Sequence, residues 1–77
     1  MTFKIKNIKL GRNGSYKSES KAIHYAFKKA EEYYTDLMEW GLSDFSIYTK
    51  EWEGVLNVYC YDYTHQKTEL FCEIHTV

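Results

Sequence analysis

Proline is absent from this chain, glycine occurs only four times in 77 residues, and there is no long apolar run. Because no proline-rich, glycine-rich or low-complexity stretch is present, the sequence offers no candidate linker, and it contains no internal repeat. We therefore expect a single domain over residues 1–77. A chain of this length buries only about 60% of its unfolded surface, so one small core and modest stability are expected.

Sequence signals for secretion and membrane insertion are also missing. Residues 1–6 alternate between apolar and polar side chains instead of placing a basic stretch before an apolar one. The sequence therefore predicts neither a signal peptide nor a membrane span. Cys60 and Cys72 are the only cysteines, and without a secretion signal they are expected to remain reduced. We expect a cytoplasmic protein with no membrane partner.

The residue patterns of enzymes and metalloproteins are lacking as well. There is no C-x-x-C pair, and the histidines are not expected to converge with the cysteines, so no metal site is predicted. The segment Gly11-Arg12-Asn13-Gly14 lacks the full glycine spacing and the lysine–serine or lysine–threonine pair of a phosphate-binding loop. No nucleophile with a nearby base and no carboxylate pair stands out. The chain is expected to be non-enzymatic and to need no cofactor.

The N-terminal residues alternate in the manner of a strand. Phe3 and Ile5 have one parity and Ile8 and Leu10 the other, which predicts a first strand with a bulge near Asn7. The glycines at 11 and 14 predict a turn. Residues 15–17 are the one candidate for a short additional strand that returns along the first.

The segment after this turn has apolar residues at the spacing of a helix. Ser18 or Ser20 is a suitable N-cap, and Gly41 is placed to end the helix, with Leu42 folding back on its last turn. Between these limits one apolar stripe recurs at three and four residues. It comprises Ile23, Ala26, Phe27, Ala30, Tyr33, Tyr34, Leu37 and Met38.

Three alternating runs at residues 44–52, 55–63 and 68–77 predict a meander. A two-residue turn at Glu53-Gly54 places Trp52 opposite Val55, and a three-residue loop at residues 65–67 places Cys60 opposite Cys72. We therefore expect an α+β fold, in which a single helix packs on one face of a mostly antiparallel four-stranded sheet in the order β-α-β-β-β. The short segment at 15–17 would be an extra strand.

These two registers sort the side chains of the meander into two faces. The residues expected under the helix are Phe45, Ile47, Leu56, Val58, Cys60, Leu70, Cys72 and Ile74. The residues expected on the opposite face are Tyr48, Lys50, Trp52, Tyr59, Tyr61, Tyr63, Glu69, Phe71, Glu73 and His75. One helix covers only one side of such a sheet, so the aromatic face is expected to meet a partner. The alternative is that the rings only shield neighbouring backbone.

An aromatic sheet face is suited to stacking the bases of single-stranded nucleic acid. Glu51, Glu53, Glu69 and Glu73 are expected on or beside it, and they would repel phosphates. The first hypothesis is therefore a small inhibitor or regulator that docks on a larger protein or nucleoprotein complex. Its protein-binding residues are expected to be Tyr48, Trp52, Tyr59, Tyr61, Tyr63, Phe71, Glu69 and Glu73.

The charges divide along the chain. Residues 1–30 contain eight basic residues and one acid, whereas residues 31–77 contain two basic residues and ten acids. The second hypothesis is nucleic-acid binding through Lys4, Lys6, Lys9, Arg12, Lys17, Lys21 and Lys28. The alternative is that these lysines only guard a sheet edge against aggregation. A third hypothesis is a homodimer formed by the aromatic faces or by the opposite charges.

The order of elements, namely a strand, a helix and a three-stranded meander in a compact lysine- and tyrosine-rich chain, resembles that of several small phage-encoded inhibitors, anti-CRISPR proteins among them. The resemblance covers arrangement and size and no residue motif. It implies an anti-defence or other inhibitory role.

Overall fold

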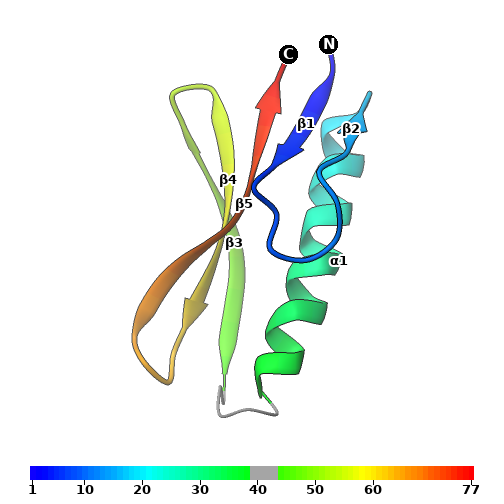
Figure 1. Ribbon diagram of the computed structural model, residues 1–77. Coiled ribbons are helices and arrows are strands. Elements are labelled where there is room, and N and C mark those ends of the chain that lie inside the picture. Colours follow the sequence, from blue (N-terminus) through cyan, green and yellow to red (C-terminus); the bar gives the residue numbers. More distant parts are fainter. Residues whose placement is uncertain (39–43) are drawn as a thin grey trace.

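The computed structural model describes residues 1–38 and 44–77 and shows one helix packed on an antiparallel sheet (Figure 1). In chain order the elements are β1 (Phe3–Lys6), β2 (Ser15–Tyr16), α1 (Glu19–Met38), β3 (Phe45–Trp52), β4 (Val55–Asp62) and β5 (Lys67–Thr76). The order across the sheet is β2-β1-β5-β4-β3. The predicted α+β class is confirmed, and with β2 the described residues form five strands instead of four.

The first strand is shorter than predicted, because it ends at Lys6 and does not continue through a bulge. Asn7 has a φ of 58°, a left-handed conformation that asparagine adopts more readily than most residues. The loop that follows is closed by the Ile8 amide, which donates to the Asn13 side chain at 3.1 Å. This loop returns the chain so that β2 pairs with β1, as expected for residues 15–17.

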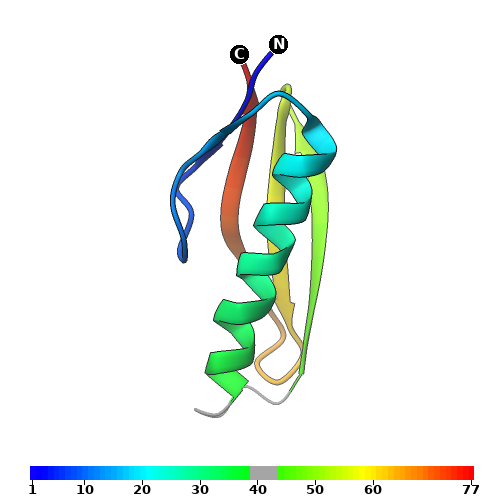
Figure 2. The ribbon, with the colours of Figure 1, turned by 90° about the vertical axis from the view of Figure 1, so that its right-hand side faces the viewer.

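Helix α1 begins directly after Ser18, whose carbonyl accepts the first helical hydrogen bond from Ala22. Ala22, Ala26 and Ala30 are fully buried, and these small side chains at every fourth position let the helix approach the sheet closely. Figure 2 shows α1 running along the sheet with the β1–β2 loop beside it. The predicted helix end at Gly41 and Leu42 lies outside the described residues.

The hairpin between β3 and β4 has the predicted register, with Trp52 opposite Val55 and Tyr48 opposite Tyr59. Both turn residues have positive φ, 51° at Glu53 and 79° at Gly54, which matches the right-handed twist of the two strands. The two-residue turn therefore fixes which side chains of β3 and β4 face the helix.

The predicted register between β4 and β5 is wrong. The loop spans residues 63–66 instead of 65–67, and Asp62 pairs with Lys67. The Asp62 carboxylate accepts hydrogen bonds from the amides of Thr64 and His65, at 2.9 and 3.2 Å, and it lies 2.6 Å from His65 Nδ1. Because Asp62 binds these two amides, the turn begins at residue 63, two residues earlier than in the predicted loop at 65–67.

A bulge in β5 shifts the register again. Val58 pairs with Cys72 and Tyr59 pairs with Leu70, so Phe71 is an extra residue on the bulged strand. The Phe71 ring is fully buried, and its centroid lies 5.8 Å from that of Tyr33 and 5.9 Å from that of Tyr34. Phe71 therefore packs beneath α1 and not on the opposite face of the sheet.

The core lies between α1 and the inner face of the sheet. Its buried residues are Ile5, Ala22, Ala26, Ala30, Tyr34, Val58, Cys60, Phe71, Cys72 and Ile74. Cys60 pairs with Glu69 and Cys72 with Val58, so the prediction that the two cysteines lie opposite each other is wrong. Both thiols are free and buried, and burial raises the pKa of Cys60 to about 11 and that of Cys72 to about 12. In the described part of the chain, no helix has the length and apolar character needed to cross a membrane.

Candidate functional site

The side of the sheet that α1 does not cover is the candidate site, and Figure 1 shows it turned away from the helix. Strand alternation and the observed registers define its residues. We call this surface the open face, and it comprises Lys4, Lys6, Ser46, Tyr48, Lys50, Trp52, Val55, Asn57, Tyr59, Tyr61, Thr68, Leu70, Glu73 and His75, with Tyr63 packed against Tyr61 at its end.

Aromatic side chains occupy the β3–β4 half of the open face. Tyr48 and Tyr59 stack with their centroids 5.5 Å apart, and Tyr61 and Tyr63 meet edge to face at 4.8 Å. Trp52, at the end of β3, is the most exposed of the rings, with 67% of its surface accessible. The patch therefore presents ring edges, hydroxyl groups and one free indole.

Polar side chains occupy the β1–β5 half. Lys4 lies opposite His75, and Lys6 lies opposite Glu73. The Glu73 carboxylate accepts a hydrogen bond from the Asn7 amide at 2.9 Å and lies 3.0 Å from His75 Nε2. These contacts, the Asn7 hydrogen bond foremost, hold the pKa of Glu73 below its ordinary value of 4.5. The negative charge of Glu73 is thus engaged within the protein.

The structure corrects the placement of two predicted site residues. Phe71 is buried under the helix, and Leu70, expected in the core, lies on the open face with 36% of its surface exposed. Glu69 pairs with Cys60 on the helix side, where its carboxylate forms an ion pair with Lys9 at 2.9 Å. Both exchanges follow from the bulge, because an extra residue reverses the alternation.

The prediction of an acidic open face is therefore wrong. Glu51 pairs with Leu56 on the helix side, and Glu53 lies in the β3–β4 turn. The strand residues of the open face carry three lysines, Lys4, Lys6 and Lys50, and a single glutamate, Glu73. This surface is aromatic and basic.

The predicted basic residues gather near β1, β2 and the start of α1 but do not form one surface. Lys4 and Lys6 lie on the open face, and Lys9 is paired with Glu69. Arg12 lies in the β1–β2 loop and Lys17 follows β2. Lys21 and Lys28 line a groove between β2 and α1, on the helix side of the sheet.

Sequence reasoning missed Leu70 on the open face and the tyrosines of that groove. The run Leu70-Phe71-Cys72, three apolar residues in succession, was the signal for a bulge, because alternation cannot place all three correctly. Among residues 1–38 and 44–77, no three His, Cys, Asp or Glu side chains are grouped to hold a metal ion. Comparison of the chain with known protein families, curated proteins and solved structures finds no match.

Proposed function

We propose that this protein is a non-enzymatic inhibitor or regulator that docks through its open face on an acidic surface of a larger protein. The observation that carries the proposal is the exposed cluster of tyrosines and Trp52 on the side of the sheet that α1 leaves uncovered. Tyrosine and tryptophan are the side chains that most often dominate protein interfaces, and clustered apolar surface of this kind marks an interaction site.

The charges of the open face support an acidic partner. Lys50 lies within the aromatic β3–β4 half of the open face, and Lys4 and Lys6 lie in its β1–β5 half. No ion pair engages these three lysines in the described residues, whereas Glu73 is held by Asn7 and His75. Complementary charge would steer the partner to this face and set its orientation.

The arrangement of the rings favours a protein over single-stranded nucleic acid. Base stacking needs free ring faces, but Tyr48 and Tyr59 each cover one ring face of the other. Ring edges, hydroxyls and an exposed indole instead suit the mixed polar and apolar surface of a folded protein.

Site-specific photo-crosslinking in cells of the source organism tests the proposal. A photoreactive phenylalanine analogue is placed at Trp52 on the open face, and at Met38 on the helix as a matched exposed control. We expect a defined protein adduct from position 52 that is absent from position 38. Equal adducts from both positions, a nuclease-sensitive adduct, or an adduct of twice the chain mass would refute docking on a protein partner.

Two matched pairs of substitutions measure the contribution of the open face once the crosslinked partner is isolated. Trp52→Ala is expected to weaken binding about thirtyfold, as loss of an interface hot spot does. Met38→Ala, which removes an exposed apolar side chain elsewhere, should leave affinity unchanged. Lys50→Glu should also weaken binding, and Lys67→Glu, outside the open face, serves as its charge control. Equal losses within each pair would contradict the proposed orientation.

A further inference from the structure

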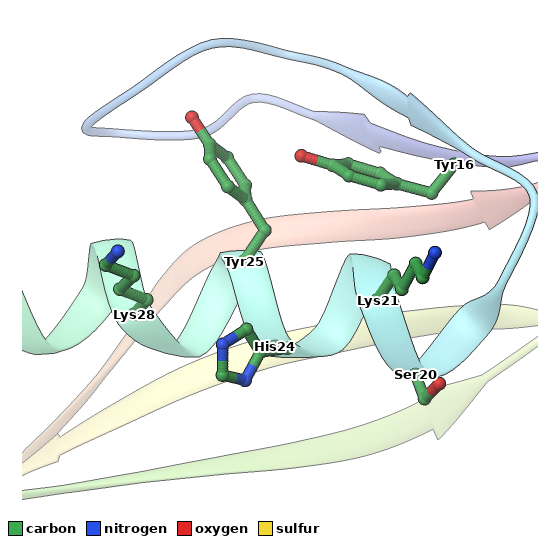
Figure 3. A pocket seen from close by; sticks show the side chains of 6 residues that line it. All are labelled: Tyr16, Ser20, Lys21, His24, Tyr25 and Lys28. Atoms are coloured by element: carbon green, nitrogen blue, oxygen red, sulfur yellow. The ribbon is translucent and has the colours of Figure 1, made fainter.

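We propose that the protein has a second binding site, a groove between β2 and the first half of α1 that takes a nucleotide. The groove has a volume of about 590 Å³ and is lined by Tyr16, Ser20, Lys21, His24, Tyr25 and Lys28 (Figure 3). This volume falls in the range of about 300–1,000 Å³ that is typical of small-ligand sites. The groove lies on the helix side of the sheet, so the inference goes beyond docking through the open face.

Two tyrosine rings form one wall of the groove. Tyr16 comes from β2 and Tyr25 from α1, and their centroids lie 5.8 Å apart with the planes tilted by 37°. In Figure 3 both rings stand on the side of β2, above the lysines of the helix. Each ring adds apolar surface to the groove, and a planar base can pack against either ring.

Contacts from the β1–β2 loop and from Lys29 of α1 fix the Tyr25 ring in place. Its hydroxyl accepts a hydrogen bond from the Arg12 amide at 3.3 Å, and Lys29 Nζ lies 5.8 Å from its ring centroid. Gly11, with a φ of 95°, allows this contact, because a Cβ there would lie 2.6 Å from the Tyr25 hydroxyl. A ring fixed in this way loses little side-chain entropy when a ligand binds.

Cationic and polar groups of α1 form the rest of the groove. Lys21, His24 and Lys28 recur at spacings of three and four residues and so share one side of the helix, with Ser20 beside them. Neither Lys21 nor Lys28 has an ion-pair partner in the described part of the chain, and no acidic residue lines the groove. Two free ammonium groups, an imidazole and a hydroxyl suit a phosphate.

The position of Lys21 argues against a purely structural role. Lys21 lies in the first turn of α1, where a cation opposes the helix macrodipole. Lys21 is therefore placed where it does not improve helix stability and where the helix N-terminus adds to the attraction of an anion. Lys28 lies in the middle of the helix and contributes only its own charge to the groove.

The combination of a ring wall with a phosphate-binding side defines the ligand class. A carboxylate or inorganic phosphate would use only the lysines, and an apolar ring would use only the tyrosines. A nucleotide uses both, with its base against Tyr16 and its phosphate beside Lys21 and Lys28. The same unit is present in a free mononucleotide and in single-stranded nucleic acid.

Titrations of the intact protein followed by amide chemical shifts test the site with four probes. AMP is expected to shift the amides of residues 16–28, whereas adenosine and inorganic phosphate should bind at least about tenfold more weakly, because each lacks half of the contacts. A short oligoadenylate that binds much more tightly than AMP assigns the site to nucleic acid. Equal affinity for the two assigns it to a free nucleotide. Inorganic phosphate binding as well as AMP, or no shifts with any probe, would overturn the proposal.

Substitutions inside and outside the groove distinguish binding at this site from general charge attraction. Lys21→Ala combined with Lys28→Ala should weaken AMP binding by about tenfold or more. Lys9→Ala combined with Lys67→Ala makes the same change of net charge outside both the groove and the open face and should have no effect. Tyr16→Leu should weaken binding, and Tyr16→Phe, which keeps the ring, should restore it. Equal losses from the two lysine pairs would show that the groove is not a site.

Discussion

Replacing Phe71 by alanine is expected to destabilise the fold far more than replacing its neighbour Leu70 by alanine. Phe71 is fully buried and contacts the rings of Tyr33 and Tyr34, whereas Leu70 keeps 36% of its surface exposed on the open face. A phenylalanine-to-alanine change in a core costs about 3–5 kcal/mol. Truncation of a half-exposed leucine on a solvated face, where no cavity is closed, costs about 1 kcal/mol.

The difference is large compared with the stability of the whole domain. At 0.05–0.15 kcal/mol per residue, a chain of this length is stable by about 4–12 kcal/mol, so Phe71→Ala removes a large part of that free energy. Phe71→Leu keeps most of the buried volume and should cost about 1–2 kcal/mol. This milder variant provides a measurable value if Phe71→Ala does not fold.

Urea unfolding followed by circular dichroism gives the free energy of unfolding of each variant. The expected order of destabilisation is Phe71→Ala, then Phe71→Leu, then Leu70→Ala. A regular β5 without a bulge predicts the reverse, because Leu70 would then lie under the helix and Phe71 on the open face. A cost for Leu70→Ala that equals or exceeds that for Phe71→Ala would therefore refute the bulge.

Three further predictions concern the titratable groups. Burial raises the pKa of both thiols, so Cys60 and Cys72 should not react with a thiol reagent at neutral pH until the protein is unfolded by denaturant, and rapid labelling of the folded protein would contradict their burial. The pKa of Glu73 is lowered on folding, so its contribution to stability is present above its unfolded pKa and is lost as the pH falls through the folded value. Urea midpoints from about pH 7 to about pH 3 should fall less in Glu73→Gln than in the wild type, and parallel curves would refute this. Lys9→Met breaks an exposed ion pair with Glu69 and should cost no more than about 1 kcal/mol, with a smaller difference in high salt.

The elements that sequence reasoning placed correctly are those with a local physical cause. The Glu53-Gly54 turn has the two positive φ values that its residues favour, and this alone fixes the faces of β3 and β4. Helix α1 begins directly after Ser18, one of the two expected N-cap residues, and its buried side follows from the spacing of its apolar residues. Each of these depends on residues close together in the chain.

The errors arose where a side-chain contact altered the backbone. Asp62 captures the amides of Thr64 and His65 and so sets the loop, which turn length alone could not reveal. Asn7 ends β1 by adopting a left-handed conformation, where alternation had suggested that the strand continues. The charge of the open face was wrongly predicted for a related reason. Its sign depends on which side of the sheet Glu51 and Glu69 occupy, and both lie on the helix side.

The bulge at Phe71 links the packing of the core to the charge of the open face. In an unbroken alternation, Phe71 and Glu69 would lie on the open face and Leu70 under the helix. The extra residue exchanges these positions, so that the phenylalanine fills the space beneath Tyr34 and the carboxylate meets Lys9 on the helix side. The open face thereby loses a negative charge and gains an aliphatic side chain opposite Tyr59. One irregularity in β5 therefore sets both the filling of the core and the sign of the surface offered to a partner, and a substitution that restored the regular register would change both together.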